Sequence, residues 1–448
     1  MTGHTLRIIF LVIALLLIDL YVLSGLKGIK RWKFFQTRKF VRLYWLSSVF
    51  LLADLFFVVF IKMGVMGRVF LITFFFLVFL FKISYLPVLV IDDIRRFIIY
   101  LKNKLKNRRG VSHTPSPADN SATGQNNKGI FNTPLQDNPP NPHSIPRSEF
   151  LMKAGLLAGA IPLAAIKVTM KSGCYDYHVI RQNLYLPNLP KAFDGIRLGQ
   201  ISDIHSGSFF NKKAVLGGVE MLMKEKADFI FFTGDLVNSL SSEVKDYLDI
   251  FSKVKAPLGV YSCLGNHDYG DYAWWPDAKS KRKNQDEIIG AHKTMGYDLL
   301  MNEHRRLKIG NEEIGILGIE NWGELSRFPK YGRMDLAVKD TDDLPVKLLL
   351  SHDPSHWRAQ VLPEYPQIDM MFSGHTHGMQ MGVRTENFQW SPIEYIYNEW
   401  AGHYQQGKQQ LYVNVGYGFL NFAGRIGILP EITIFTLKTG PPPLAKQS

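Results

Sequence analysis

The sequence predicts two parts of different fold class, a helical transmembrane region followed by an α/β domain. Leu, Ile, Val and Phe dominate the first ninety residues. From about Tyr175 onward, short apolar runs that end in polar residues alternate with stretches of helical periodicity. With 448 residues, the chain is long enough for a membrane region and one globular domain of about 250 residues.

Three apolar segments, at about residues 6–26, 43–61 and 69–91, are each long enough to span a bilayer, which takes about 20 residues. Asp19 and Asp54 interrupt the first two segments. An acidic side chain inside a membrane is costly and often functional, but the sequence identifies no basic partner for either residue. The alternative is a carboxyl group that faces the interior of a helix bundle.

The net charge of +13 is concentrated in two stretches, residues 27–42 and 92–110, which we expect to be loops beside apolar segments. Together they contain 14 of the 52 basic residues and 2 of the 39 acidic ones, which leaves 38 against 37 elsewhere. The excess therefore predicts membrane orientation, not nucleic-acid binding. Both stretches are expected in the cytoplasm, with the N-terminus outside.

The next two segments connect the membrane region, residues 1–110, to the globular domain, residues 172–440. Residues 111–147 are rich in Pro, Asn and Ser, which predicts a disordered linker. Residues 148–171 predict a fourth apolar helix that resembles a twin-arginine export signal, although Ser148 stands where the second arginine belongs. We expect this helix to cross the membrane, which places the domain outside the cytoplasm. If it lies on the membrane surface instead, the domain is cytoplasmic.

Five apolar runs of the α/β domain end in residues that can ligate a metal ion. The runs end in SD, TGD, GNHD, SHD and GH. Because each set follows a strand, we expect them to lie on the same rim of one sheet, where layered α/β folds bind ligands. The candidates are Asp203, His205, Asp235, Asn266, His267, His352, His375 and His377.

The spacing within this set supports a common site. Asp203 and His205 are two residues apart, as are His375 and His377, and in extended backbone this spacing directs both side chains of a pair to one face. Glycines directly precede Asp235, Asn266 and His375, where they allow tight turns and close backbone approach.

The ligand types indicate hydrolytic chemistry. Carboxylate oxygen, amide oxygen and imidazole nitrogen together suit Mn, Fe or Zn. The only cysteines, Cys174 and Cys263, are not part of the set, which argues against a closed structural zinc site. The candidates exceed the needs of one ion, and a shared carboxylate can hold two ions about 3.5–4 Å apart. We therefore expect two divalent ions that activate water for phosphoryl displacement.

The order D-x-H, G-D, G-N-H-D, H and G-H-x-H resembles the signature of calcineurin-like metallophosphoesterases, over about residues 194–437. The surrounding residues resemble the membrane-associated bacterial branch of that family. The resemblance implies a four-layer α-β-β-α sandwich, in which two mixed sheets pack face to face with helices outside. It also implies a metal-dependent phosphoric ester hydrolase.

The same resemblance implies roles for individual residues. The first metal ion would be bound by Asp203, His205, Asp235 and His377. The second would be bound by Asp235, Asn266, His352 and His375, with Asp235 as the bridge. Asn266 and His267 would bind substrate, His267 would protonate the leaving oxygen, and Asp268 would orient His267 by a hydrogen bond.

Two further features allow more than a structural reading. The pair Trp274 and Trp275 next to a basic run indicates either a lid that meets lipid or substrate, or a packed insertion. Arg425 is expected to face the site, because the family often places a basic residue near there.

The sequence thus predicts a membrane-anchored dinuclear phosphoesterase that hydrolyses a phosphoester or pyrophosphate bond with metal-activated water. We expect a multi-pass protein of the cell inner membrane, with its catalytic domain on the extracytoplasmic side. Its expected partners are membrane lipids and a phosphoester substrate, lipid-linked substrates included, and not nucleic acid. The alternatives are a nucleotide phosphodiesterase that faces the cytoplasm and a non-catalytic membrane sensor or scaffold with the same fold.

Overall fold

The chain divides into two compact units, each with its own hydrophobic core. The structure, a computed structural model, describes residues 3–29, 32–60, 65–109, 153–157, 159–160, 173–385, 387–420 and 424–441. The helical unit comprises Met1–Ile61 and Phe74–Ala164. The α/β unit comprises Lys62–Thr73 and Ala165–Ser448.

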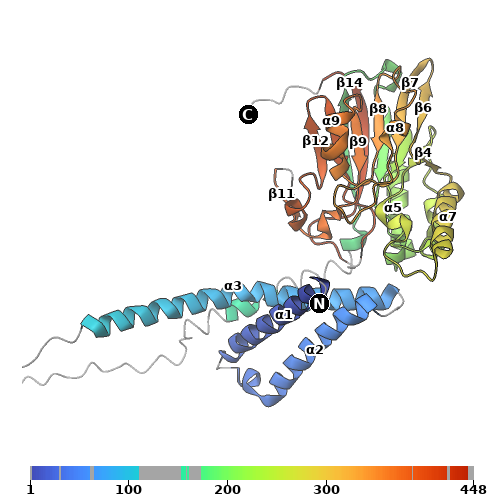
Figure 1. The fold of residues 1–448 in the computed structure, drawn as a ribbon. Coiled ribbons are helices and arrows are strands. Elements are labelled where there is room, and N and C mark those ends of the chain that lie inside the picture. Colours follow the sequence, from blue (N-terminus) through green and yellow to red (C-terminus); the bar gives the residue numbers. More distant parts are fainter. Residues whose placement is uncertain are drawn as a thin grey trace, which may run out of the picture. The chain divides into compact units, whose positions relative to one another are not determined.

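Three long helices contain the three apolar segments predicted from the sequence (Figure 1). They are α1 (Gly3–Lys27), α2 (Arg38–Phe60) and α3 (Val65–Arg109). The second basic stretch was expected to be a loop, but α3 continues through it to Arg109. The reason is its composition, since the Lys, Arg, Leu and Ile residues of this stretch are compatible with a continuous helix and Pro87, the proline of α3, lies before it.

Membrane crossing by these helices stays a prediction. Among the described residues, no helix is both long and apolar enough to cross a membrane. The expected linker, residues 111–147, lies outside the described residues. Of the fourth apolar segment, only residues 153–157 and 159–160 are described, and these are helical.

Asp19 has a basic partner that the sequence did not reveal. It is buried in the helical unit and forms an ion pair with the equally buried Lys82 of α3. The Tyr44 hydroxyl donates a hydrogen bond to Asp19 Oδ1 at 3.1 Å. The carboxyl group therefore faces the interior of the helical unit, as one of the two interpretations expected. The side chain of Asp54 lies outside those described.

The α/β unit contains two six-stranded mixed sheets (Figure 1). The first sheet has the order β1-β14-β2-β3-β4-β5, and the second has the order β12-β13-β9-β8-β7-β6. The strands of the first sheet are β1 (His178–Leu186), β2 (Arg197–Ile201), β3 (Phe229–Phe232), β4 (Val260–Ser262), β5 (Asp298–Leu299) and β14 (Glu431–Thr439). Those of the second are β6 (Glu303–Ile309), β7 (Glu312–Gly318), β8 (Lys347–Leu350), β9 (Met370–Ser373), β12 (Gly402–Gln406) and β13 (Gln409–Val413). A separate hairpin joins β10 (Val383–Arg384) and β11 (Gln389–Trp390).

The two sheets pack face to face, as the predicted sandwich requires. One buried cluster joins side chains of both sheets, and the rings of Phe231 on β3 and Phe372 on β9 lie 5.0 Å apart. Helices cover the outer faces: α5 (Lys212–Lys224), α6 (Leu248–Phe251) and α7 (Ala278–Met295) pack on the first sheet. The short helices α8 (Met334–Ala337) and α9 (Leu362–Glu364) belong to the cluster on the second. The fold is therefore a four-layer α-β-β-α sandwich.

The central strands are apolar on both faces because both faces are covered. FIFF in β3, KLLL in β8 and MMFS in β9 are buried at every position. Such continuous runs are typical of parallel strands between two layers. Strands β2, β3 and β4 are parallel in the first sheet, as are β7, β8, β9 and β13 in the second. Their carboxyl ends position the residues described next.

Candidate metal centre

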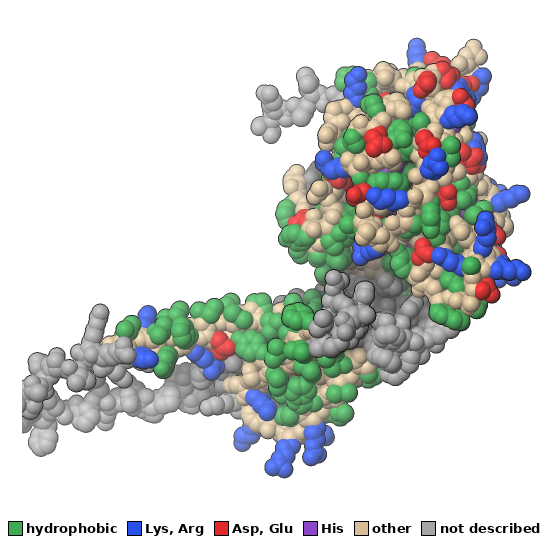
Figure 2. Space-filling view, viewed as in Figure 1, with side chains coloured by type: hydrophobic (Ala, Val, Ile, Leu, Met, Phe, Trp, Pro, Cys, Tyr) green, Lys and Arg blue, Asp and Glu red, His purple; other side chains and the backbone are tan. Residues whose placement is uncertain are grey.

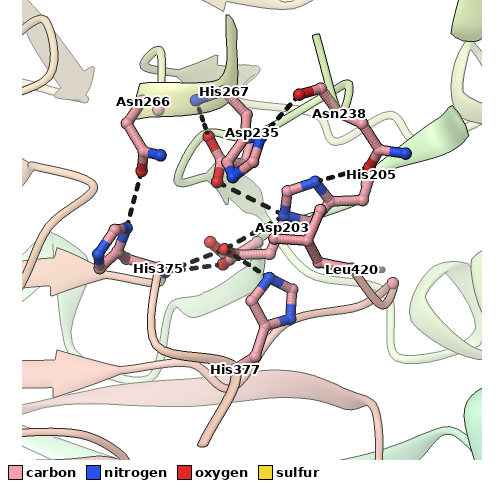
Figure 3. A network of polar contacts seen from close by, with 12 residues as sticks. Asp203, His205, Asp235, Asn238, Asn266, His267, His375, His377 and Leu420 are labelled. Atoms are coloured by element: carbon pink, nitrogen blue, oxygen red, sulfur yellow. Dashed lines mark hydrogen bonds and ion pairs between the residues drawn. The ribbon is translucent and has the colours of Figure 1, made fainter. Parts of the chain in front are cut away.

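The predicted ligands follow five strands that belong to two sheets. Asp203 and His205 follow β2, Asp235 follows β3, and Asn266 follows β4. His352 follows β8, and the G-H-x-H pair follows β9. The expectation of one rim on one sheet is therefore wrong. The site forms where the loops that follow strands of both sheets come together. Figure 3 shows several of these side chains pointing toward one another.

The structure brings the predicted ligands together as two groups that could hold metal ions. The first group is Asp203, His205 and His377, and the second is Asp235, His352 and His375. Within each group, one ligand atom from each residue lies within 4.8 Å of the others.

Asp235 lies between the two groups. Its Oδ2 atom is 3.1 Å from Nε2 of His352 and 3.5 Å from Nε2 of His205, which belongs to the other group. Its Oδ1 atom accepts a hydrogen bond from the backbone N–H of His267 at 2.9 Å. One carboxylate thus faces both groups, as a bridging ligand must.

The ligand pairs lie in tight turns and not in extended backbone, so that expectation is also wrong. Asp203, His205, Asp235, His375 and His377 all have φ between 47° and 73°. Non-glycine residues adopt this left-handed region at a cost in free energy, and such strain concentrates at functional sites. Hydrogen bonds from the main chain hold the turns, including Asp203 N–H to Gly234 O at 2.9 Å.

Two glycines provide the space for the central carboxylates. A Cβ atom at Gly265 would overlap the carboxylate of Asp235, and one at Gly374 would overlap the carboxylate of Asp203. Glycine is required at both positions because the carboxylates approach the backbone so closely. The expected role of the glycines before Asn266 and His375 is confirmed.

The donor atoms of the two groups fit divalent cations. Among the described residues, Nε2 of His205, His352 and His377 are buried without a hydrogen-bond partner. A buried polar atom without a partner is costly, and an ion coordinated by these nitrogens would remove that cost.

The second ring nitrogen of each of two histidines is fixed by the protein. Nδ1 of His352 donates to the carbonyl of Thr233 at 2.7 Å, and Nδ1 of His205 lies 3.1 Å from Oδ1 of Asn238. A hydrogen bond at one ring nitrogen sets the tautomer and directs the lone pair of the other toward a metal. Nδ1 of His377 lies 3.2 Å from the guanidinium of Arg425.

His375 is oriented by a chain of hydrogen bonds that the sequence did not reveal. Nε2 of His375 lies 2.8 Å from the hydroxyl of Tyr397, and that hydroxyl lies 3.3 Å from Oδ2 of Asp353. Nδ1 of His375 forms a hydrogen bond with Oδ1 of Asn266 at 2.8 Å (Figure 3). Asn266 thus joins the second group.

Burial controls the protonation of the chain's own groups at the site. It raises the pKa of Asp203 to about 7, and it lowers the pKa of His205 to about 3 and that of His375 to about 4. Burial also lowers the pKa of His352, but the carboxylates of Asp235 and Asp203 and the carbonyl of Thr233 together outweigh it and raise the pKa to about 10. His205 and His375 are therefore neutral at pH 7 and offer lone pairs.

Asp268 has a different set of partners from the one expected. Its carboxylate accepts hydrogen bonds from the backbone N–H groups of Gly265, Asp235, Leu236 and Val237 at 2.9–3.3 Å. Nδ1 of His267 instead bonds the carbonyl oxygen of Asn238 at 2.7 Å. The expectation that Asp268 orients His267 by a hydrogen bond is therefore corrected. The reason is that the carboxylate lies inside the turn, where four amides face it.

Three residues at the site were missed by the sequence interpretation: Asn238, Asp353 and Tyr397. The first two had a signal, because Asn238 follows G-D by three residues and Asp353 is adjacent to His352. Tyr397 had none, because it lies twenty residues after the G-H-x-H motif on a separate loop.

The two tryptophans of the basic segment differ in their packing. Trp275 is half-buried and its Nε1 donates to the carbonyl of Gly270 at 2.7 Å, whereas Trp274 is 76% exposed. The lid and the packed insertion both stay predictions. Arg425 is fully buried and bonds the carbonyls of Val415 and Gly418 at 2.9 Å. Its contact with the site is through Nδ1 of His377, 3.2 Å from the guanidinium.

Family models match both parts of the chain. The model described as probable calcineurin-like phosphoesterase, transmembrane domain, matches residues 6–174. The model of the calcineurin-like phosphoesterase matches residues 196–379.

Curated relatives have similar descriptions. The chain is 28% identical over 266 residues to the uncharacterized metallophosphoesterase YkuE of Bacillus subtilis, which covers 58% of this chain and 84% of that protein. It is 28% identical to a transmembrane protein with metallophosphoesterase domain of Danio rerio, over 58% of this chain and 57% of that protein. It is 25% identical to the UDP-2,3-diacylglucosamine pyrophosphatase LpxG of Chlamydia trachomatis, over 45% of this chain and 70% of that protein.

The motif order, the sandwich fold and the family models agree. The chain belongs to the calcineurin-like phosphoesterase family, and its metallophosphoesterase domain follows a transmembrane-associated domain.

Proposed function

We propose that the protein is a membrane-anchored phosphoesterase with two divalent metal ions, Mn, Fe or Zn, that hydrolyses a phosphoester or pyrophosphate bond. The observation that carries the proposal is the pair of buried donor groups with the carboxylate of Asp235 between them. Two adjacent ions can stabilise both the attacking and the leaving oxygen of a phosphoryl displacement, which a binding module does not need.

We assign the donor groups to two ions as the family resemblance implies. Asp203, His205, Asp235 and His377 would hold one ion. Asp235, Asn266, His352 and His375 would hold the other. Two bound ions would lower the pKa of a water molecule and would neutralise charge on the phosphoryl oxygens.

His267 is the proposed general acid. Its Nδ1 bonds the carbonyl oxygen of Asn238, which fixes a proton on Nδ1 and leaves Nε2 for the substrate. From the protonated ring, Nε2–H would be donated to the leaving oxygen as the phosphorus–oxygen bond breaks. The backbone N–H of His267 bonds Asp235, so the acid and the bridging carboxylate are held in one fixed arrangement.

Asp268 is a positioning residue in this proposal. Its four amide contacts join the turn after β3 to the loop after β4. These two loops carry Asp235, Asn266 and His267, so Asp268 fixes the geometry of both donor groups without contact with substrate.

The membrane setting and the substrate class are also proposals. We place residues 1–110 and 148–171 in the cell inner membrane, with residues 172–440 on the extracytoplasmic side. The family model with a transmembrane domain supports membrane association. A relative named as a pyrophosphatase of UDP-2,3-diacylglucosamine supports a lipid-linked phosphoester.

The test is hydrolysis of a phosphomonoester and a phosphodiester reporter by the full chain in detergent, with Mn or after removal of metal. Turnover should require metal and should be lost in Asp235→Asn but not in Asp249→Asn, an exposed aspartate on α6. His267→Asn should bind metal normally yet turn over neither reporter. Wild-type protein with bound metal that hydrolyses neither the two reporters nor a long-chain phosphoester lipid would contradict the proposal and favour a sensor or scaffold.

A further inference from the structure

An exposed apolar surface, which we name the apolar rim, follows the G-H-x-H loop. Six of the twelve large hydrophobic side chains that are exposed in the described part of residues 173–441 lie within residues 379–396. They are Met379, Val383, Phe388, Trp390, Tyr395 and Ile396. Figure 2 shows hydrophobic side chains gathered over the region of β11. Contiguous exposed apolar surface in a folded unit marks an interaction site.

The rim is built on a rigid base. Ile393, Tyr397 and Trp400 of the same segment are buried in a small core with Val415 and Ile428. Hydrogen bonds join this base to the metal-site loop: Ser391 Oγ donates to Gly378 O at 2.8 Å, and Thr376 Oγ1 donates to Trp400 O at 2.7 Å. The outward apolar side chains therefore belong to an ordered surface that already has its own core.

Two charged side chains in or next to the rim segment form ion pairs, and a third, Glu394, is half-buried. Arg384 forms an ion pair with the buried Glu431, and the buried Glu399 forms one with Arg358. What remains outward is dominated by aromatic and aliphatic groups, with Tyr395 77% and Phe388 60% exposed. Trp390 and Tyr395 also contact each other through their polar atoms, Nε1 and OH, at 3.4 Å.

The rim is continuous with the metal centre. Tyr397, from its base, bonds Nε2 of His375 at 2.8 Å, and Met379 follows His377 by two residues. A substrate whose phosphate lies at the donor groups would therefore have its adjoining part next to the rim.

We propose that the apolar rim enters the acyl region of a phospholipid bilayer, so that the phosphate of an amphiphilic substrate reaches the metal centre from the lipid. Trp and Tyr, with an apolar body and a polar edge, are the residues that favour the membrane–water interface. The same chain carries the transmembrane-associated domain, which makes lipid the neighbouring apolar phase. The substrate class named here rests on the proposed phosphoesterase function, whereas the lipid contact of the rim does not.

The test of lipid contact uses the full chain in phosphatidylcholine nanodiscs, with an environment-sensitive fluorophore on Tyr395→Cys. The native Cys174 and Cys263 are buried, so unmodified chain treated in the same way gives the background. Lipids that carry a quencher on the acyl chain should reduce the emission severalfold. The matched control is a label on Leu336→Cys, 46% exposed on α8, which should not be quenched. Equal quenching at both positions, or none at 395, would overturn the proposal.

A second measurement separates the rim from the chemistry. The double variant Trp390→Ser with Tyr395→Ser should turn over a long-chain phosphoester lipid in bilayers about tenfold more slowly, while turnover of a soluble diester stays unchanged. Leu336→Ser should alter neither rate. Equal loss on both substrates would assign the rim a structural role and overturn the substrate part. If wild type hydrolyses neither substrate, the phosphoesterase function fails, and the quenching result still decides the lipid contact.

Discussion

At the scale of single residues, the orientation of imidazole rings is the feature that the donor groups depend on most. Nε2 of His375 bonds the hydroxyl of Tyr397, which in turn bonds Asp353. His205 and His352 use Asn238 and the carbonyl of Thr233 for the same purpose. Each partner fixes one ring nitrogen, so the other is directed into the site before any ion binds.

Tyr397→Phe removes one such partner and leaves the buried ring in place. We expect the affinity for the second Mn ion to fall by about tenfold, the lower end of the range for loss of a residue behind a metal ligand. The measurement is isothermal titration of the metal-free full chain. The control is Tyr365→Phe, at the residue that follows α9, because no hydrogen bond of the Tyr365 hydroxyl is found among the described residues. This variant should bind Mn with the affinity of the wild type. Unchanged affinity in Tyr397→Phe would contradict the assigned role.

Asp268→Asn distinguishes a structural carboxylate from one that serves only His267. An amide group offers one acceptor oxygen where the carboxylate receives four backbone N–H groups. Because a buried unsatisfied donor costs about 1–3 kcal/mol, we expect the free energy of unfolding in urea to fall by at least about 2 kcal/mol. If only turnover falls while stability is unchanged, the earlier expectation of a contact with His267 regains support.

At the scale of elements, the candidate ligands lie close together because each follows the carboxyl end of a strand at the same site. Strands β2, β3 and β4 of one sheet and β8 and β9 of the other are parallel within their sheets. Left-handed residues follow three of these strands: Asp203 and His205 after β2, Asp235 after β3, and His375 and His377 after β9. Helices on the outer faces hold the sheets in this arrangement, and α7 is the longest of those described in the α/β unit.

The packing of α7 predicts a pH dependence of stability. His292 on α7 is fully buried, its Nδ1 contacts Ser262 Oγ at 2.9 Å, and burial lowers its pKa to about 3. As the pH falls below about 6.5, the unfolded chain takes up a proton that the folded chain does not, so stability falls with pH. In His292→Gln, the loss between about pH 7 and pH 5 should shrink by about 2 kcal/mol.

Urea unfolding of the full chain at both pH values checks this prediction, and fluorescence of the α/β unit's tryptophans is a suitable signal. The exposed His178 provides the control, because His178→Gln makes the same substitution at the protein surface. An acid loss in His292→Gln as large as in wild type would show that other groups dominate.

At the scale of the whole molecule, the two units differ in how their buried charged side chains are compensated. The helical unit buries an ion pair, Asp19 with Lys82, beside the hydroxyl of Tyr44. This ion pair links α1 to α3. Removing one of its partners would leave a buried charge unpaired, which costs far more free energy than the loss of a surface ion pair. The α/β unit concentrates its buried charge at the donor groups, where bound cations would compensate it.

Metal removal should therefore destabilise the α/β unit. A cation that binds only the folded state raises stability by about 2.7 kcal/mol at a hundred times its dissociation constant. We expect the unfolding temperature of the full chain to rise with added Mn and to fall with a chelator. The rise should shrink in Asp235→Asn and persist in Asp249→Asn. A rise of equal size in both variants would place the stabilising ion elsewhere.

The sequence alone predicted what depends on local pattern. The apolar runs of α1, α2 and α3 gave the three helices, and the strand-then-polar-end runs gave β2, β3, β4, β8 and β9. The motif order was enough for the family, the sandwich and the eight candidate ligands, because residue type and spacing carry that information.

Only the tertiary structure decided how these parts meet. The ligands come from two sheets and from left-handed turns, since face-to-face packing brings strand ends together that no local pattern connects. Several contacts join residues that are far apart in the chain. Asp268 accepts from the amide of Leu236 and not from the adjacent His267, His375 bonds Tyr397, and Asp19 pairs with Lys82. Hydrogen bonds and ion pairs depend on distance in space, and sequence separation does not encode it.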